Sequence, residues 1–287
     1  MKQFIINNDP DKNNFISFTG KDYHYLVNVR RLAAGEYFPA LLPNGEETLV
    51  QIVSIEKNIL SGKCHKNASQ SSNNIPDLLS APVRHNGNDS GNIPPIILFQ
   101  ALPKGDKMDL IVRQAAEGGI SEIIPFVSEF SHGKANVGKE KFSRWQRIVK
   151  EARQQSGSKI ATSLQPPLTM NELIEYWNKV KFAASPDNAL GLLFHHVPYQ
   201  PDIKNHAEGL EQKSLHGYLS SNRQIVVFVI GPEGGFSDNE VSLFIKNGFN
   251  PLTIGGAVLR TETAALYCAA AIRILLLEKD AWEPKII

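Results

Sequence analysis

One segment near the C-terminal end constrains the fold more than any other. Residues 225–230 (Ile-Val-Val-Phe-Val-Ile) form an unbroken apolar run that leads directly into the glycine-rich stretch 231–236 (Gly-Pro-Glu-Gly-Gly-Phe). A helix start follows, because Ser237 and Glu240 have the spacing of a capping box. A fully apolar strand of this kind is typical of the centre of a parallel sheet covered on both faces. Ligands of such sheets bind beyond the carboxyl ends of the strands, so we predict a ligand site at this turn.

The chain from residue 95 onward alternates in the same way between apolar runs and helical patterns. Strands are expected at 96–102, 123–127, 182–184, 192–194, 225–230 and 250–254. Helices are expected at 106–117, 139–155, 171–178 and 264–277, and the two tryptophans in these helices, Trp145 and Trp177, are expected in the core. This alternation predicts an α/β domain with a mostly parallel sheet and helices on both faces over residues 95–287.

The N-terminal part has a different character. A hairpin turn is expected at 43–45 (Pro-Asn-Gly), before a strand at 48–50, and a further strand is expected at 52–55. We therefore predict a small β-rich domain over residues 1–72. Residues 73–94 are rich in Asn, Ser and Gly and predict a polar linker to the larger domain.

Composition excludes several classes of protein. With 42% hydrophobic and 21% charged residues the chain resembles an ordinary globular protein, and no apolar run is long enough to predict a membrane span or a signal peptide. Cys64 and Cys268 form no CxxC pair, and the His195-His196 pair lacks helical ligand spacing, so we expect no metal and a cytoplasmic protein. Because the net charge is only +1, any contact with RNA has to come from a local basic patch.

The ligand of the turn at 231–235 is constrained by what the turn lacks. Neither the GxGxxG fingerprint nor a phosphate loop is present, and Glu233 would repel a pyrophosphate but would tolerate a neutral or cationic ligand such as a sulfonium. The alternative is a plain βα turn in which Glu233 is solvated or faces the helix dipole. A second glycine turn follows the expected strand at 250–254. The helix after it is apolar on nearly every face, which indicates burial in the core or against a second subunit.

Two motifs together resemble a known family. Residues 230–237 (Ile-Gly-Pro-Glu-Gly-Gly-Phe-Ser) and 259–264 (Leu-Arg-Thr-Glu-Thr-Ala) resemble the RsmE family of SPOUT-class, trefoil-knotted methyltransferases, and weaker agreement extends over most of the chain. These enzymes methylate N3 of a uridine in 16S ribosomal RNA of the small ribosomal subunit. The resemblance implies a knotted SPOUT domain, a homodimer, and a PUA-like barrel over residues 1–72 that helps to bind RNA.

The resemblance also implies a site. S-adenosylmethionine would be held by three loops, largely through backbone groups. The implied cofactor contacts are His195, Ile230, Gly231, Pro232, Glu233, Gly234, Gly235, Ile254, Gly255, Gly256, Val258, Leu259 and Thr261. Arg260 is the candidate for stabilising negative charge on the uracil carbonyls, and Glu262 and Glu233 are candidate bases or orienting groups. An alternative is a structural ion pair between Arg260 and Glu262. Thr261 and Thr263 are expected to cap the last helix.

RNA contacts are expected in the N-terminal domain at His24, Arg30 and Arg31, although adjacent arginines can equally form a solvated face. The sequence departs from the family pattern at three places, which are Ala257, Ser158 and the segment 114–119. Arginine is expected at the first two places and Lys-Ala-Thr-Glu-Leu-Gly at the third. These departures leave two alternatives open. One is a non-catalytic RNA- or ribosome-binding protein that keeps the fold, and the other is a SPOUT methyltransferase with another RNA target.

Overall fold

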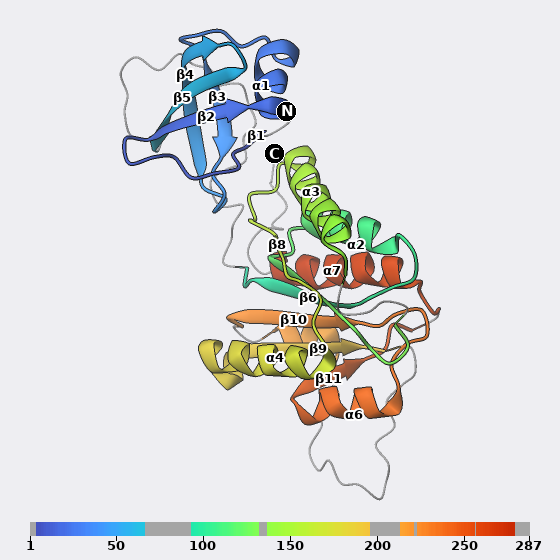
Figure 1. Ribbon diagram of the computed structural model, residues 1–287. Coiled ribbons are helices and arrows are strands. Elements are labelled where there is room, and N and C mark those ends of the chain that lie inside the picture. The colour runs from blue at the N-terminus through green and yellow to red at the C-terminus, as the bar shows by residue number, and fades with distance from the viewer. Residues whose placement is uncertain are drawn as a thin grey trace, which may run out of the picture. The chain divides into compact units, whose positions relative to one another are not determined.

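The computed structural model describes residues 4–66, 93–131, 137–195, 213–220, 223–255 and 257–278. The chain divides into two compact units (Figure 1). The smaller unit comprises Met1–Arg84 and Arg153–Ala161, and the larger comprises His85–Ala152 and Thr162–Ile287. The expected linker at 73–94 lies outside the described residues except at its last two positions, 93 and 94.

The smaller unit is built on a five-stranded sheet in the order β1-β3-β4-β5-β2. Its strands are β1 (Phe4–Ile5), β2 (Phe15–Thr19), β3 (Tyr37–Leu41), β4 (Glu47–Glu56) and β5 (Ile59–Lys66). The expected hairpin turn joins β3 to β4, with Gly45 at a φ of 89°. The strands expected at 48–50 and 52–55 are one strand, β4, whose pairing with β5 shifts register between Ile52 and Ser54. A helical segment, α1 (Gly20–Tyr23) and the π-helical η1 (His24–Val29), follows β2.

The larger unit contains a six-stranded sheet in which every pairing is parallel, in the order β11-β9-β10-β6-β7-β8. Its strands are β6 (Ile96–Ala101), β7 (Glu122–Phe126), β8 (Ser163–Leu164), β9 (Ala189–Phe194), β10 (Ile225–Ile230) and β11 (Phe249–Leu252). Strand β10 pairs with β9 on one side and β6 on the other. Its alternate side chains enter two different cores, Val226 and Phe228 one of them and Val227 and Val229 the other. Burial of both faces explains why this strand is apolar throughout.

Helices cover both faces of this sheet (Figure 1). Residues of α2 (Lys107–Glu117), α3 (Lys139–Ser156), α5 (Leu215–Leu219) and α7 (Thr261–Leu277) share one core, which includes Trp145. Residues of α4 (Met170–Ala184) and α6 (Asp238–Lys246) share the other, which includes Trp177. Both tryptophans are buried, as predicted. The mostly parallel α/β domain is thereby confirmed. None of the described helices is long and apolar enough to span a membrane.

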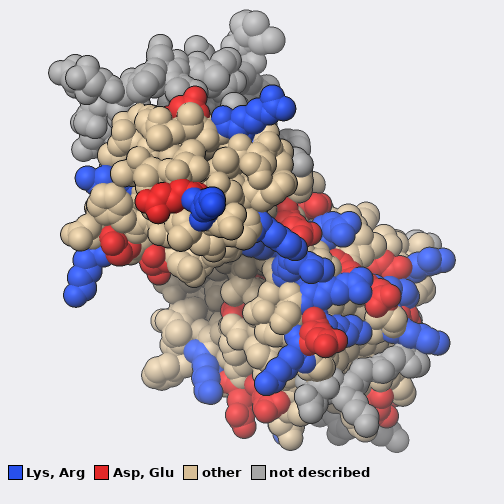
Figure 2. All heavy atoms as spheres, turned by 45° about the horizontal axis from the view of Figure 1, so that its top comes forward, with Lys and Arg blue, Asp and Glu red and all other residues tan. Residues whose placement is uncertain are grey.

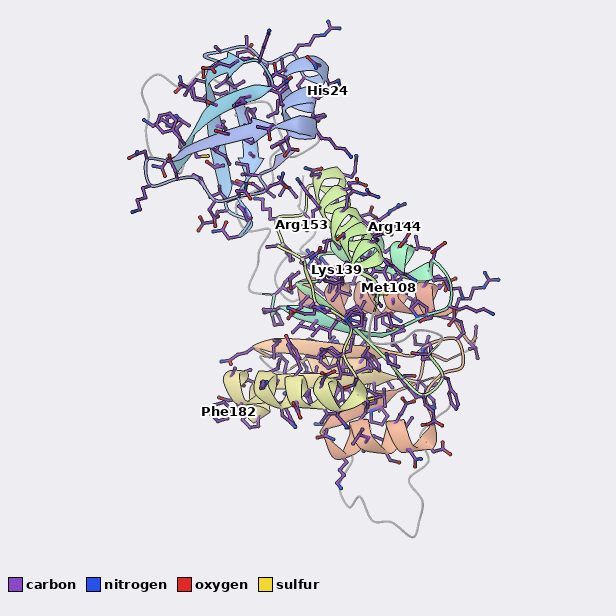
Figure 3. All side chains as sticks on the ribbon, viewed as in Figure 1. His24, Met108, Lys139, Arg144, Arg153 and Phe182 are labelled. Atoms are coloured by element: carbon purple, nitrogen blue, oxygen red, sulfur yellow. The ribbon has the colours of Figure 1, made fainter. Side chains whose placement is uncertain are left out.

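The strand expected at 182–184 was wrong, because these residues form the last turn of α4. A capping box between Thr169 and Glu172 starts this helix, which extends past the predicted end at Asn178 to Ala184. Ser185, with a φ of 65°, then ends it. Phe182 lies on the outer side of the helix and is 89% exposed (Figure 3), so the apolar triplet that suggested a strand is not a buried run.

Candidate functional site

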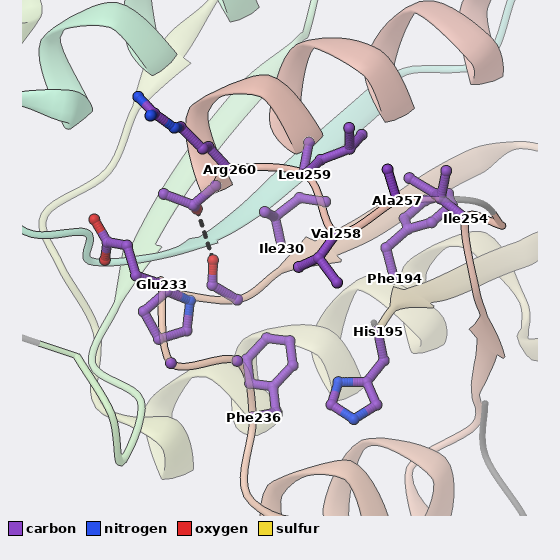
Figure 4. A pocket seen from close by; sticks show the side chains of 16 residues that line it. Phe194, His195, Ile230, Glu233, Phe236, Ile254, Ala257, Val258, Leu259 and Arg260 are labelled. Atoms are coloured by element: carbon purple, nitrogen blue, oxygen red, sulfur yellow. Dashed lines mark hydrogen bonds between the residues drawn. The ribbon is translucent and has the colours of Figure 1, made fainter. Parts of the chain in front are cut away.

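The carboxyl ends of three neighbouring strands open into one pocket (Figure 4). Its volume is about 320 Å³, which lies within the range of small-molecule sites. The pocket is lined by Phe194, His195, Ile230, Gly231, Pro232, Glu233, Gly234, Gly235, Phe236, Ile254, Ala257, Val258, Leu259, Arg260, Thr261 and Ala264. Strands β9, β10 and β11 deliver these segments because parallel strands end at the same edge of a sheet.

Tight packing explains the glycines of the turn after β10. A Cβ atom added at Gly234 would lie 2.9 Å from the Cβ atom of Phe130, and one at Gly231 would lie 3.2 Å from the Phe236 ring. Gly235 adopts a φ of 72°, which favours glycine, and its N–H donates to the carbonyl of Pro232 at 2.9 Å. The turn therefore brings bare backbone to the pocket wall.

The helix that follows the turn starts as predicted. Ser237 caps α6 and Glu240 completes the capping box. The second Glu240 carboxylate oxygen accepts a hydrogen bond at 2.8 Å from the backbone N–H of Glu129, which precedes Phe130. The same residue therefore fixes both the start of α6 and the loop that packs on Gly234.

A buried hydrogen-bond chain connects the pocket to the centre of the sheet. The Thr261 hydroxyl donates to the carbonyl oxygen of Gly231 at 2.7 Å (Figure 4) and accepts from the Gln100 amide nitrogen at 3.0 Å. The expected role of Thr261 as a helix cap is therefore not found. The N-cap position of α7 is Arg260, which makes no side-chain cap, and the Thr261 hydroxyl is directed to the turn instead.

Lys107 contacts both acidic site candidates. Its ammonium lies 2.7 Å from a carboxylate oxygen of Glu233 and 3.6 Å from one of Glu262. The backbone N–H of Lys104 also donates to Glu233, at 3.2 Å. Burial alone would raise the pKa of Glu233, but the hydrogen bonds from Lys107 and from backbone N–H groups outweigh it, and the pKa is lowered. Hydrogen bonding to Glu233 likewise raises the pKa of Lys107. Both groups are therefore charged at neutral pH.

The ion pair considered between Arg260 and Glu262 is not among the ion pairs of the described residues, in which Glu262 pairs with Lys107. Arg260 lines the pocket and is exposed (Figure 4), and its side chain has no hydrogen-bond or ion-pair partner in the described part of the chain. The lysine that holds both carboxylates was not predicted. Its side chain comes from α2, and nothing in the sequence relates residue 107 to residues 233 and 262.

Most of the expected site residues line this one pocket. Gly255 and Glu262 are described but do not line it, and Gly256 lies outside the described residues. Four lining residues were not predicted, namely Phe194, Phe236, Ala257 and Ala264. Phe236 and Ala264 lie within the motifs at 230–237 and 259–264, and Phe194 and Ala257 adjoin predicted residues, so counting whole motifs and their neighbours could have found all four.

The expected RNA contacts lie in the smaller unit. His24 begins η1 and is exposed, Arg30 follows η1 and is half-buried, and Arg31 is exposed with a φ of 55°. No group of three or more His, Cys, Asp or Glu side chains within the described ranges is placed to hold a metal ion. Cys64 and Cys268 are both free and buried, and burial raises the pKa of the Cys268 thiol to about 12.

A parallel sheet with a ligand pocket at glycine-rich turns, together with a small β domain, is the architecture of an RNA-methyltransferase class. Residues 91–273 match the family model of the RNA methyltransferase domain, and residues 18–63 match that of the RNA methyltransferase PUA domain. The fold is therefore the predicted SPOUT type with a PUA-like N-terminal domain.

Similar proteins identify the family within that class. The chain is 31% identical to the ribosomal RNA small subunit methyltransferase E of Synechocystis, over 91% of this chain and 73% of the relative. It is 29% identical to the ribosomal RNA small subunit methyltransferase E 2 of Borreliella burgdorferi, over 96% and 98%. The chain belongs to the ribosomal RNA small subunit methyltransferase E family.

Two solved structures share the fold. The ribosomal RNA small subunit methyltransferase E of Neisseria gonorrhoeae, crystallised bound to S-adenosyl methionine, has a TM-score of 0.65 and 22% identity over 96% of this chain and 98% of that one. A probable rRNA-methyltransferase from Porphyromonas gingivalis has a TM-score of 0.69 and 20% identity over 97% and 100%. The two structures support the fold, and the family model and the sequence relatives confirm the resemblance to the RsmE family.

Proposed function

We propose that this protein transfers a methyl group from S-adenosylmethionine to N3 of a uridine in 16S ribosomal RNA of the small ribosomal subunit. The observation that carries the proposal is the convergence of the two family motifs, residues 230–237 and 259–264, on one pocket of about 320 Å³. The relatives in the same family are small-subunit ribosomal RNA methyltransferases by name.

The pocket suits a cofactor of this kind. Its walls combine apolar side chains such as Phe194, Ile230 and Leu259 with backbone groups of the glycine turn. Packing excludes a side chain at Gly234 and crowds one at Gly231, so the turn presents main chain to a ligand. The turn at 231–235 and the segment 257–260 would hold the cofactor. When bound, S-adenosylmethionine supplies an electrophilic methyl group.

The chain's own residues then have to deal with the N3 proton and its charge. Methylation at N3 replaces the N–H bond by an N–C bond, and the proton must leave the base. Arg260, at the pocket wall and without a partner in the described chain, is suited to stabilise negative charge on the two uracil carbonyl oxygens. Glu233 is held ionised by Lys107, and its lowered pKa makes it a weak proton acceptor. We assign Glu233 and Glu262 to orienting the turn and the start of α7.

We assign RNA binding in the N-terminal domain, over residues 1–72, to His24, Arg30 and Arg31. Residues 73–94 act as a linker, the catalytic domain extends from 95 to 287, and the protein works in the cytoplasm. We further assign homodimerisation to α7, because this helix leaves Leu266, Tyr267 and Ile274 exposed on its outer side.

The test is methyl transfer from labelled S-adenosylmethionine to small ribosomal subunits taken from cells that lack the protein, followed by nucleoside analysis. We expect labelled 3-methyluridine. Arg260→Ala should lower turnover more than cofactor affinity, since a charge stabiliser acts in the transition state. An equal loss of both would make Arg260 a binding residue.

Other results would favour the alternatives. Cofactor binding without label in 16S RNA would indicate another RNA target. No cofactor binding and no transfer would indicate a non-catalytic RNA-binding protein, for which the missing basic side chain at Ala257 of the pocket would be the structural reason.

A further inference from the structure

Helix α3 concentrates the positive charge of the chain. Its 18 residues include six Lys or Arg and two Glu, which gives a net charge of +4. The whole chain has a net charge of only +1, so the residues outside α3 are negative on balance. The local basic patch that RNA binding requires in a nearly neutral chain is therefore present in this one element.

Four of the six cations of α3 lie on its outer face or at the edge of that face, whereas Arg153 is buried. Its inner face carries Trp145, Ile148, Val149 and Ala152, which are buried in the core that α3 shares with α2, α5 and α7. With 3.6 residues per turn, Lys139, Arg147 and Lys150 fall on the side opposite this apolar stripe, and Arg144 falls at its edge. Figure 3 shows Lys139 and Arg144 on the same helix. The side chain of Arg147 is 61% exposed and that of Arg144 is 51% exposed.

The two acidic residues of α3 do not neutralise the positive charge of its outer face. Glu151 lies 3.8 Å from Arg147, as an exposed pair one turn apart, and Glu140 is exposed near the start of the helix. Exposed pairs of this kind contribute little stability, so the arginine remains available to another anion. In Figure 2 Lys and Arg side chains form a band over the larger unit, with fewer Asp and Glu side chains between them.

Contacts within the larger unit connect the basic face to the pocket. The indole N–H of Trp145 donates to Asp109 of α2 at 3.0 Å, and Arg144 forms an ion pair with the same carboxylate. The Lys141 ammonium lies 3.5 Å from the carbonyl oxygen of Gly105, in the turn before α2. Lys104 in that turn donates to Glu233 of the pocket. The turn at Lys104 and Gly105 therefore contacts both the start of α3 and the pocket wall.

The opposite face of the sheet has no comparable charge. Helix α4 carries two Lys and two Glu, a net charge of zero, and α6 carries one Lys, one Asp and one Glu, a net charge of −1. Lys179 of α4 and Lys246 of α6 are exposed, like Lys139 and Arg147 of α3. The asymmetry therefore belongs to one side of the domain and is not a property of its surface in general.

We propose that the outer face of α3, formed by Lys139, Arg144, Arg147 and Lys150, binds the phosphate backbone of the substrate RNA and holds it beside the pocket. The inference rests on the proposed function for its choice of polyanion. Arg and Lys on one helical face can follow successive phosphates, and each contact releases condensed counterions. Such contacts carry no sequence information, so the surface positions the RNA while the pocket selects the base.

The test compares two pairs of substitutions in the full-length chain. Lys139→Gln with Arg147→Gln removes two charges from α3, and Lys179→Gln with Lys246→Gln removes two from the opposite sheet face. Binding to unmodified 16S RNA is measured across a salt series. We expect the slope of log affinity against log salt to become shallower by about 1.4–1.8 for the α3 variant, from 0.7–0.9 per lost phosphate contact, and to stay unchanged for the control.

A second readout separates positioning from damage to the fold. The α3 variant should raise KM for RNA while cofactor affinity and turnover at saturating RNA stay as in the unsubstituted chain. Equal slopes for the two variants, or a loss of cofactor affinity in the α3 variant, would overturn the proposal. RNA binding is measured without catalysis, so the two proposals can fail separately. If the α3 substitutions change the slope but the chain transfers no methyl group, RNA binding by α3 stands and only the proposed activity is refuted.

Discussion

At the scale of single residues, the pocket depends on how closely Gly234 approaches Phe130. A Cβ atom at position 234 would lie 2.9 Å from the Cβ atom of Phe130, a separation that real Cβ atoms essentially never show. Gly234→Ala should therefore displace the turn or the loop, at a cost of about 1–3 kcal/mol in folding stability. Because the turn forms the pocket wall, cofactor affinity should fall as well.

The chain offers a matched test of this steric cause. Phe130→Ala keeps the clashing Cβ atom and should not rescue Gly234→Ala, whereas Phe130→Gly removes it and should. Both effects are measured by calorimetric titration with S-adenosylmethionine and by urea denaturation, on Gly234→Ala alone and combined with each Phe130 substitution. If the Ala and Gly substitutions at 130 rescue equally, the contact between the two Cβ atoms is not what excludes a side chain at 234.

The side-chain interactions that sequence reasoning missed share one property, which is that their two partners are distant in the chain. Ser237 and Glu240 were predicted correctly as a capping box because the two members are three residues apart. The Thr261 hydroxyl, which was expected to make a similar local bond, instead bonds to Gln100, 161 residues away. Its spacing alone could not distinguish a cap from this tertiary contact, because only the folded sheet brings β6 beside the start of α7.

At the scale of elements, the helices and strands that are most deeply buried were the easiest to predict from the sequence. Strand β10 was predicted with its bounds correct because both of its faces are buried, which leaves a continuous apolar signature. The last turn of α4 was mistaken for a strand because Phe182 and two alanines give a short apolar run that carries no period. The pairing of Lys107 with Glu233 and Glu262 had no local signature, because it joins α2 to the turn after β10 and to α7.

The ion pairs of Lys107 with Glu233 and Glu262 make the folding stability depend on pH. The folded pKa of Glu233 is lowered, so its contribution is present above its ordinary pKa of 4.5 and is lost as pH falls through the folded pKa. The folded pKa of Lys107 is raised, so its contribution is present below 10.5 and is lost as pH rises through the folded pKa. The ion pair between Lys107 and Glu233 therefore stabilises the fold fully between pH 4.5 and pH 10.5.

Lys107→Met should consequently destabilise the protein near pH 7 by about 0.5–1 kcal/mol, since the pair is partly exposed. The difference from the unsubstituted chain should shrink at acidic pH, once the pH has fallen below the lowered pKa of Glu233. Urea denaturation at both pH values measures it, with Lys107→Arg as the control that keeps the charge. A deficit of equal size at the two pH values would mean that Lys107 stabilises by packing and not by charge.

At the scale of the whole molecule, charge and apolar surface are distributed unevenly, and neither follows from composition. The chain has a net charge of +1 although helix α3 alone has +4, and only the fold shows that Lys139 and Arg147 are exposed while Arg153 is buried. The apolar character of α7 was likewise visible in the sequence, but two explanations for it remained. The structure shows a partial answer, since Ala265, Cys268 and Ile272 are buried in the core while the opposite side stays exposed.

The exposed side of α7 predicts how the chain assembles. Leu266 and Ile274 are each 40% exposed and Tyr267 is 56% exposed, so one stripe of the helix presents apolar side chains to solvent. Leaving such a stripe in water is unfavourable, and a second copy of the chain that packs on it would remove the cost. We expect sedimentation analysis to give twice the chain mass of 31.8 kDa.

Leu266→Glu with Ile274→Glu should convert the dimer to a monomer, because two carboxylates would then be buried in an apolar interface without partners. Phe182→Glu is the control, because Phe182 is 89% exposed on α4 and lies on the other face of the sheet. It should leave the mass unchanged. A monomeric unsubstituted chain, or dimers that survive the double substitution, would show that α7 is not the interface and that its exposed apolar stripe needs another explanation.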